Sequence, residues 1–354
     1  MRIAVIAGDG IGPEVTAEAL KVLGAVTDVF GRRFDIERLP FGADYVLQTG
    51  VSMPERYFEA FRTDFDAILM GALGDPRIPG LQYIRDILLG IRFKLDLYVN
   101  YRPVELLDER LCPLKGRTPA DVQMHIFREN TEGLYVGIGG RFKPDTDEEI
   151  AVQEEVNTYK GVRRIIVHAF EYARAHGLTK VCMADKSNAI THGHALWQRV
   201  FKDVAAGYPD IEPTHMYIDA LTMFMVNEPQ RFQVIVTNNL FGDIITDLGA
   251  TLQGGLGMAA SANVHPGRTS MFEPVHGSAP PLAGKNVANP IGAILSMALM
   301  LDHLGLASEA RAVERAVALA VRTSQVTAEI GGSLGTDATG SFIADAVRRA
   351  GADA

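Results

Sequence analysis

Cysteine is scarce in this chain of 354 residues, because only Cys112 and Cys182 occur. A disulfide-stabilised scaffold has many more cysteines, and neither residue lies in a CxxC or Cys/His pair of the kind that binds structural zinc. The sequence therefore indicates a protein that needs no oxidising compartment. We expect a cytoplasmic location.

Positive charge and long hydrophobic runs are also missing. The chain has 34 Lys and Arg residues against 43 Asp and Glu residues, which gives a net charge of −9. A surface that binds a phosphate backbone needs a basic stripe, so nucleic acid is excluded as the main partner. The most apolar stretch, residues 291–301, is too short to span a bilayer. The opening MRIAVIAGDG also lacks the apolar region of a secretory signal. We expect no membrane association.

The composition that is present is that of a folded protein. Hydrophobic residues make up 47% of the chain and charged residues 22%, and the length favours two domains over one compact core. Hydrophobic patterns predict strands that alternate with helices, which is typical of an α/β protein with a largely parallel sheet. The predicted strands are 3–7, 67–70, 123–127, 180–184, 216–218 and 234–237, and the predicted helices are 14–23, 163–176, 195–205 and 308–322.

Two glycine-rich segments stand out. Residues 8–12, GDGIG, lie between a predicted strand and a predicted helix, where glycines let a backbone approach phosphate. However, the third glycine comes too early for GxGxxG, and Asp9 would face an anionic pyrophosphate. By itself this segment predicts a tight strand-to-helix turn. Residues 272–290, FEPVHGSAPPLAGKNVANP, predict a long ordered loop, and such loops tend to be functional.

Asp243 and Asp247 are spaced so that both lie on one face of a helix. Two carboxylates so close repel each other unless a cation neutralises them, and Mg²⁺ or Mn²⁺ suits oxygen ligands. The other interpretation is a capping Asp at a helix N-terminus followed by a solvated Asp. The spacing alone leaves both interpretations open.

Several basic residues are candidates for binding an acid. The guanidinium groups of Arg92, Arg102 and Arg128 would clamp a di- or tricarboxylate if they converge. Spacing does not show convergence, and most arginines are simply exposed. Lys186 follows Asp185, so it is either half of an ordinary ion pair or, beside a metal ion, a proton acceptor.

Taken together, these segments resemble the metal-dependent β-decarboxylating dehydrogenases of 2-hydroxy acids, the isocitrate/isopropylmalate dehydrogenase family. The resemblance covers nearly the whole chain and is carried by GDGIGPEV, NYRPV, RENTEGLY, ADKSN, YIDA, NLFGDIITD, FEPVHGSAP and ANP. It is closest to the 3-isopropylmalate and tartrate or D-malate enzymes. It implies an α/β, two-domain fold that is not a Rossmann fold, with the active site in the cleft between domains. Residues 1–98 plus 251–354 would form the first, cofactor-side domain, and 99–250 the second, for dimerisation, metal and substrate.

The resemblance also implies catalytic and metal-binding roles. Lys186 matches the lysine that takes the hydroxyl proton, and Tyr135 matches the tyrosine that protonates the enol. Asp219, Asp243 and Asp247 match the ligands of Mg²⁺ or Mn²⁺. The family forms homodimers with shared active sites, so Lys186 and Asp219 would come from the neighbouring subunit.

Substrate and cofactor residues are implied in the same way. The substrate-binding residues would be Arg92, Arg102 and Arg128 for the carboxylates, with Leu88 beside the variable substituent. The NAD-binding residues would be Ile11, His276, Gly277, Ser278, Ala279, Pro280 and Asn289.

Two departures from the family pattern affect specificity. Pro281-Leu282 stands where NAD-dependent members usually have an Asp and NADP-dependent isocitrate enzymes a Lys-Tyr pair; the missing cation favours NAD. Leu88 and Leu89 replace the Ser and Asn of isocitrate enzymes, which favours 3-isopropylmalate. The RENTEG segment, however, resembles the homoisocitrate and tartrate branches, so a tartrate/D-malate or homoisocitrate dehydrogenase is the alternative. A non-catalytic carboxylate-binding homologue, suggested by Pro281, is a third hypothesis.

Overall fold

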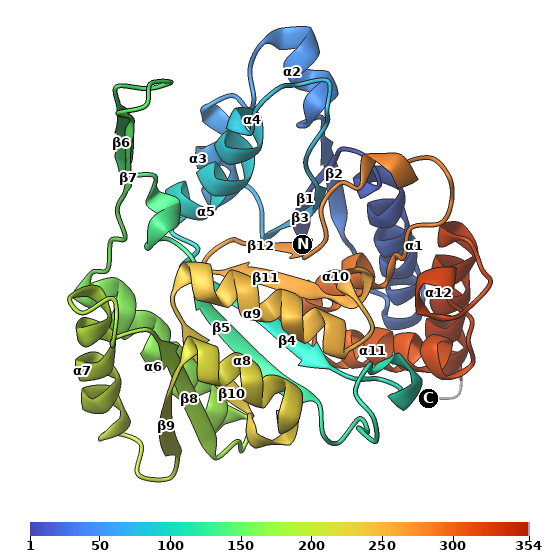
Figure 1. Ribbon diagram of the computed structural model, residues 1–354. Helices are drawn as coiled ribbons and strands as arrows, with labels where there is room; N and C mark the ends of the chain where they lie inside the picture. The colour runs from blue at the N-terminus through green and yellow to red at the C-terminus, as the bar shows by residue number, and fades with distance from the viewer. Residues whose placement is uncertain (353–354) are drawn as a thin grey trace. The chain divides into compact units, whose positions relative to one another are not determined.

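A computed structural model describes residues 1–352 (Figure 1). The contacts within the chain define two compact units. The first contains Met1–Leu97, Arg102–Val122 and the chain from Ala250 onward, and the second contains Tyr98–Tyr101 and Gln123–Gly249. Residues 102–122 thus pack with the first unit, whereas the sequence placed them in the second. The roles of the two domains stay predictions.

The first unit is built on strands in the order β2-β1-β3-β12-β11. Strands β1, β2, β3 and β12 pair in parallel, and β11 pairs with β12 in antiparallel fashion. Every residue of β3 is buried, as expected for a parallel strand covered on both faces. The bounds are β1 Arg2–Gly8, β2 Asp35–Leu39, β3 Ala67–Ala72, β11 Ala260–Val264 and β12 Ser270–Pro274.

Helices lie on both faces of this sheet. One core contains the side chains of Ala4, Ile6 and Ile68, together with Phe58 and Ile91 from the helices on that face. Successive strand residues point to opposite faces, and on the other face α1 contacts both α10 and α12 (Figure 1). The helices are α1 Gly12–Phe30, α2 Ala43–Thr49, α3 Arg56–Thr63, α4 Gln82–Ile84, α5 Gly90–Lys94, α10 Ile291–His303, α11 Ala307–Arg322 and α12 Thr336–Ala352, with a π-helical turn Arg85–Leu89 between α4 and α5.

The second unit has parallel strands in the order β5-β10-β8-β9. Helices α6 and α7 pack against each other, and α6 contacts β5, β8 and β10. The bounds are β5 Gln123–Glu129, β8 Lys180–Asp185, β9 Glu212–Tyr217, β10 Val234–Thr237, α6 Tyr159–Ala175, α7 Gly193–Ala205, α8 Ile218–Asn227 and α9 Asn239–Leu252. Strand β4, Val99–Glu105, is divided between the two units.

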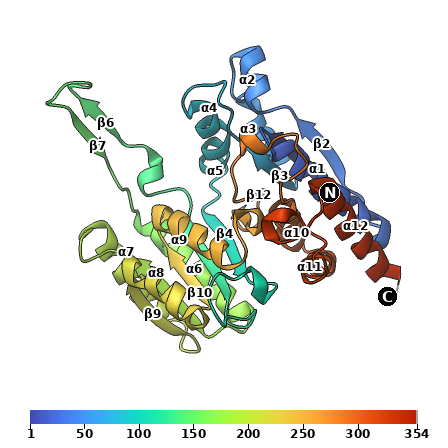
Figure 2. The same ribbon diagram turned by 45° about the vertical axis from the view of Figure 1, so that its right-hand side comes forward.

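An antiparallel arm stands away from the rest of the second unit (Figure 2). It consists of β6 (Gly139–Phe142) and β7 (Ile150–Gln153), and every residue of both strands is exposed. Phe142 is 63% exposed and Ile150 is 55% exposed, so the arm carries large apolar side chains that this chain does not cover.

The predicted α/β architecture with mostly parallel strands is confirmed, with one local correction. The strand predicted at 216–218 begins earlier, at Glu212, and ends at Tyr217, because Ile218 starts α8. Most residues of β9 are exposed and polar, so a search for apolar residues found only its end. Among the described residues, no helix is long and apolar enough to cross a bilayer.

Candidate active site

Arg128, Tyr135 and Asp243 form a cluster in the second unit. Arg128 is the next-to-last residue of β5 and only 1% of its side chain is exposed, and its Nη1 forms an ion pair with Asp243 Oδ1. The Tyr135 hydroxyl donates to Asp243 Oδ2 at 2.9 Å, and the Arg128 guanidinium lies 5.1 Å from the centre of the Tyr135 ring. Three of the predicted site residues, one each for substrate, catalysis and metal, are therefore brought together.

Two residues of the NNLFGD segment shape this cluster, although the sequence did not predict a role for them. Asn239 Oδ1 accepts hydrogen bonds from Nε and Nη2 of Arg128 at 2.9 and 2.7 Å. Gly242 gives the arginine room, because a Cβ there would lie 2.5 Å from the Arg128 Cβ. The two adjacent asparagines after the apolar strand β10 were the available signal.

The predicted metal ligands lie on two helices. Asp243 and Asp247 are one turn apart on α9, as their spacing predicted. Asp219 lies in the first turn of α8, where its Oδ1 is 2.6 Å from Lys186 Nζ. The hydrogen bond from Lys186 lowers the pKa of Asp219 below its ordinary value. Among the described residues of this one chain, no three His, Cys, Asp or Glu side chains group closely enough to hold a metal ion.

The donor set nevertheless suits a hard divalent cation. All three predicted ligands are carboxylates, and Mg²⁺ and Mn²⁺ prefer oxygen. Asp243 remains 40% exposed, so its carboxylate is open to solvent on one side.

Arg92 and Leu88 lie in the first unit, on the helical segment that also contains the π-helical turn. Arg92 is 5% exposed, and its Nη2 is 2.7 Å from Glu273 Oε1. Asn263 Nδ2 donates to the same oxygen at 2.8 Å. The Arg92 Nε is buried without a hydrogen-bond partner among the described residues, which leaves a donor for an anion. Leu88 packs partly buried against the core. Glu273, which the sequence analysis missed, supplies the counter-charge that a buried guanidinium needs.

Arg102 and Asp9 are two further buried charged residues of the first unit. Arg102 lies on β4 and is 7% exposed. The Asp9 carboxylate accepts hydrogen bonds from the backbone N–H groups of Ala43 and Gly74 and from the Tyr83 hydroxyl. Asp9 thus ties the strand-to-helix turn of GDGIG to three neighbouring segments of the first unit, and its carboxylate is bonded within the fold.

The predicted cofactor loop contacts this turn. The Ile11 N–H donates to the Ser278 carbonyl at 2.8 Å. Gly10 has φ +59°, and a Cβ on it would lie 2.0 Å from that same carbonyl oxygen, so only glycine permits the approach. His276 Nε2 is buried without a hydrogen-bond partner among the described residues, and burial lowers the pKa of its ring. An unpaired ring nitrogen is what a polar ligand group would satisfy.

The remaining predicted cofactor-binding residues differ in backbone conformation and in burial. Ala279 has φ +38°, a conformation that a residue with a Cβ rarely adopts and that clusters at ligand-binding loops. Gly277 and Pro280 on either side are exposed. Asn289 is buried, and its Oδ1 accepts the Ile291 N–H at the start of α10. The structure thus gives Asn289 a capping role.

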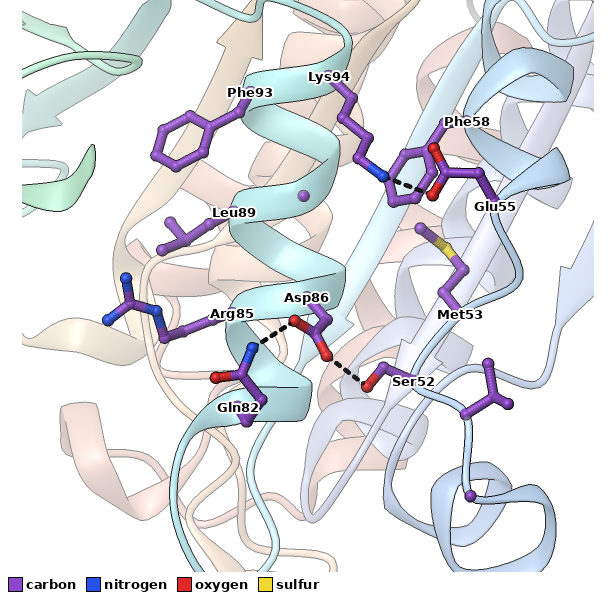
Figure 3. A pocket seen from close by; sticks show the side chains of 13 residues that line it. Ser52, Met53, Glu55, Phe58, Gln82, Arg85, Asp86, Leu89, Phe93 and Lys94 are labelled. Atoms are coloured by element: carbon purple, nitrogen blue, oxygen red, sulfur yellow. Dashed lines mark hydrogen bonds and ion pairs between the residues drawn. The ribbon is translucent and has the colours of Figure 1, made fainter. Parts of the chain in front are cut away.

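A separate pocket of about 560 Å³ lies between residues 82–94 and residues 50–58 of the first unit (Figure 3). Lys94 Nζ reaches Glu55 Oε2 across it at 2.5 Å, whereas Arg85 points away from this ion pair. Leu89, one of the two leucines that favour 3-isopropylmalate, lines this pocket, whereas the predicted catalytic, metal-binding and cofactor-binding residues are not among its described lining residues.

Fold and site together define a class: an α/β enzyme whose buried arginines suit a carboxylate and whose tyrosine, lysine and aspartates suit proton transfer beside a cation. The model of the family "Isocitrate/isopropylmalate dehydrogenase" matches residues 2–347, and the chain belongs to this family. It is a decarboxylating dehydrogenase, as the sequence predicted.

Individual relatives agree over almost the full length. The chain is 46% identical over 353 residues to the 3-isopropylmalate dehydrogenase of Thermobifida fusca, covering 99% of each chain. It is 47% identical over 337 residues to that of Mycobacterium avium, covering 94% of this chain and 98% of the relative. The crystal structure of isocitrate dehydrogenase from Methylococcus capsulatus aligns with a TM-score of 0.89 at 37% identity, covering 98% of this chain and 99% of that one. The predicted fold family is confirmed.

Proposed function

We propose that this chain catalyses the NAD- and Mg²⁺- or Mn²⁺-dependent oxidative decarboxylation of 3-isopropylmalate, a 3-substituted malate. The observation that carries the proposal is the cluster of Arg128, Tyr135 and Asp243, in which a buried guanidinium and a phenol both bond to one carboxylate on α9. It is supported by relatives at 46 to 47% identity that are named 3-isopropylmalate dehydrogenase.

In this proposal the chain binds the substrate through Arg92, Arg102 and Arg128, all of which are buried. Buried guanidinium groups hold carboxylates strongly because water competes little. Lys186 accepts the proton of the substrate hydroxyl. After the β-carboxylate has left, the Tyr135 hydroxyl donates a proton to the enolate carbon, and closing the site to water keeps this step selective.

Asp243 and Asp247, with Asp219 of the neighbouring subunit, would hold the cation, and Ile11 with residues 276–280 and Asn289 would hold NAD. Bound NAD supplies the hydride acceptor, and the bound cation lowers the pKa of the substrate hydroxyl and stabilises negative charge on its oxygen. Residues 276–282 contain no Lys or Arg, so these seven residues would not neutralise the additional phosphate of NADP. This supports NAD.

A homodimer with shared active sites is part of the proposal. The second unit leaves large apolar side chains uncovered on three elements, which are Met223 of α8 at 64% exposure, Ile244 of α9 at 53% and Phe142 of the arm at 63%. Exposed large apolar side chains are typical of an interface. Asp219 lies in the first turn of α8 and bonds to Lys186, so a partner that docks on α8 would meet both.

The RENTEG segment favours one alternative, a tartrate/D-malate or homoisocitrate dehydrogenase. Its Glu132 carboxylate accepts the Thr158 N–H at 2.8 Å and the Thr158 hydroxyl at 2.5 Å at the start of α6. This contact holds the loop that carries Tyr135 against α6. Glu132 thus has a role within the fold that is independent of the substrate, which keeps 3-isopropylmalate as the proposed substrate.

The decisive experiment is a steady-state panel. NADH or NADPH formation and CO₂ release are measured with 3-isopropylmalate, D-malate, tartrate, homoisocitrate and isocitrate, with Mg²⁺ or Mn²⁺ and after chelation. We expect the highest kcat/KM with 3-isopropylmalate, NAD and metal. Faster turnover of D-malate, tartrate or homoisocitrate would establish the alternative. Metal binding without turnover of any of these acids would revive the non-catalytic homologue.

A further inference from the structure

His194 is completely buried in the second unit and touches the proposed proton acceptor through the backbone. It lies in the first turn of α7, and its side chain is 0% exposed. The Lys186 backbone N–H donates to His194 Nδ1 at 2.7 Å. The other ring nitrogen, Nε2, is 3.1 Å from both Glu155 Oε1 and Asn238 Nδ2. The ring therefore bridges the Lys186 turn and a carboxylate that follows the arm.

These contacts determine which ring nitrogen carries the proton. A nitrogen that accepts an N–H bond has a free lone pair, so Nδ1 is unprotonated and the proton is on Nε2. His194 Nε2 then donates to Glu155. Burial works against ionisation of Glu155, but hydrogen bonds from His194 and Asn238 leave its pKa below the ordinary value. An ionised Glu155 stabilises the Nε2–H tautomer, which is the one that can bind the Lys186 N–H.

The same network reaches the helix that carries the metal carboxylates. Asn238 Nδ2 donates to Glu155 Oε1 at 3.0 Å. Asn238 Oδ1 accepts the Phe241 N–H at 2.8 Å and so caps the first turn of α9. Strands β8 and β10 are parallel neighbours, and Thr237 Oγ1 donates to the Ala184 carbonyl at 2.8 Å. The Lys186 turn and the start of α9 are therefore fixed relative to each other.

We propose that His194 is a positioning residue that holds Lys186 in its reactive place, with Glu155 fixing the tautomer and Asn238 extending the network to α9. The proposal rests on the proposed function of Lys186. Without an acceptor at Nδ1, the part-buried Lys186 N–H loses its bond, and the turn that presents the amine relaxes to satisfy it. A displacement of about 1 Å at a reacting group can reduce the rate about 100-fold.

Two substitutions of His194 distinguish a positioning role of its side chain from a role in packing alone. In His194→Asn, the amide oxygen lies where Nδ1 was and can accept the Lys186 N–H. In His194→Gln, the amide lies at the Nε2 end, near Glu155, and leaves the Lys186 N–H without an acceptor. We expect kcat to fall about 100-fold in H194Q and less than about 10-fold in H194N, with similar KM for the hydroxy acid because the arginines are untouched. Asparagine is the smaller residue, so a pure packing role predicts the opposite order.

The control variant is Val200→Ala. It lies on the same helix, is 1% exposed and has an apolar side chain, so its truncation lowers the unfolding temperature by loss of packing and removes none of the hydrogen bonds of His194 or Glu155. We expect its kcat to stay near that of the wild type. If kcat followed the unfolding temperature across all three variants, or if H194N and H194Q lost kcat equally, the positioning role would be refuted.

A spectroscopic measurement without substrate tests the tautomer directly. The chain has nine histidines, and with ¹⁵N-labelled histidine the His194 ring is assigned as the signal missing from H194N. We expect the shift pattern of a neutral Nε2–H ring. A neutral Nδ1–H ring or a doubly protonated ring would overturn the proposal. Because this readout needs no turnover, it distinguishes failure of the His194 proposal from failure of the proposed activity, which the wild-type substrate panel tests.

Discussion

At the scale of single residues, the candidate site depends on where side chains are absent as much as on where they are present. Arg128 lies flat against α9 because Gly242 has no Cβ, and this approach lets its Nε and Nη2 reach Asn239 while Nη1 reaches Asp243. The arginine is thus oriented by three contacts on one helix. A guanidinium held this way is pre-organised for a carboxylate.

Gly242→Ala is expected to disturb this arrangement. The new Cβ would lie 2.5 Å from the Arg128 Cβ and Cγ, so the arginine must shift, at a loss of about 1–3 kcal/mol of folding stability. We expect kcat/KM to fall with it. Gly24→Ala on α1 is the matched control, because nothing lies within 4 Å of its Cβ position, and it should raise stability by up to about 1 kcal/mol. Urea unfolding and steady-state kinetics measure both. Normal kinetics in G242A would show that Arg128 needs no exact placement.

Asp243→Asn tests the proposed metal site. Asparagine keeps the size of the side chain but removes the charge that would bind a cation and that pairs with Arg128. We expect Mn²⁺ affinity, measured by calorimetry, to fall at least about 10-fold and metal-dependent turnover at least about 100-fold. Asp203→Asn, an exposed position on α7, should change neither quantity. Unaltered Mn²⁺ binding in D243N would remove Asp243 from the ligand set.

At the scale of elements, the second unit is organised by how α6 packs on the sheet. His168 of α6 packs edge-on against Tyr98, which precedes β4, and against Phe127 of β5, with ring centres 6.5 and 5.4 Å apart. Burial lowers the pKa of His168 to about 4. A histidine kept neutral in the folded chain but protonated in the unfolded chain makes stability depend on pH.

The direction in which folding stability changes with pH follows from the folded and unfolded pKa values of His168. The unfolded pKa is about 6.5, above the folded value, so the stability contribution is present above pH 6.5 and is lost as the pH falls toward 4. Between pH 7.5 and 5.0 this one residue removes about 2 kcal/mol. His168→Phe keeps an aromatic ring without titration, so its loss of stability over that pH range, measured by urea unfolding, should be smaller than the wild-type loss by about that amount. An unchanged pH dependence would mean that His168 can accept a proton without unfolding.

Elements also show what could be predicted from the sequence. Strands such as β3 and β10 are short continuous apolar runs, so their positions were predictable. The helix face shared by Asp243 and Asp247 was also predictable, because the two residues are four positions apart. The partners of Arg128 are more than 100 residues away along the chain, and those of Arg92 are 181 residues away. Such pairings depend on which strands become neighbours in the sheet. The local periodicity of the sequence carries no information about that strand order. The family resemblance named Arg128 and Asp243, but not Asn239, Glu273 or His194, which hold the functional groups in place.

At the scale of the whole molecule, one described chain does not gather a complete metal site, while α8, α9 and the arm leave apolar side chains uncovered. The uncovered apolar side chains support the proposed homodimer. In that proposed arrangement Lys186 would serve the site to which the neighbouring chain contributes Tyr135, so the two residues would belong to different chains in every site.

Subunit complementation tests this arrangement. Lys186→Ala and Tyr135→Phe homodimers should each be almost inactive, because every site lacks one proton-transferring group. In a mixed dimer, one site carries both substitutions and the other carries neither. Refolding the two variants together at equal concentration makes about half of the dimers mixed, each with one intact site, so we expect about a quarter of wild-type activity to return. Co-refolding each variant with itself is the control. If the mixture stayed as inactive as its parents although mass spectrometry showed mixed dimers, Lys186 and Tyr135 would have to serve the same site from the same chain.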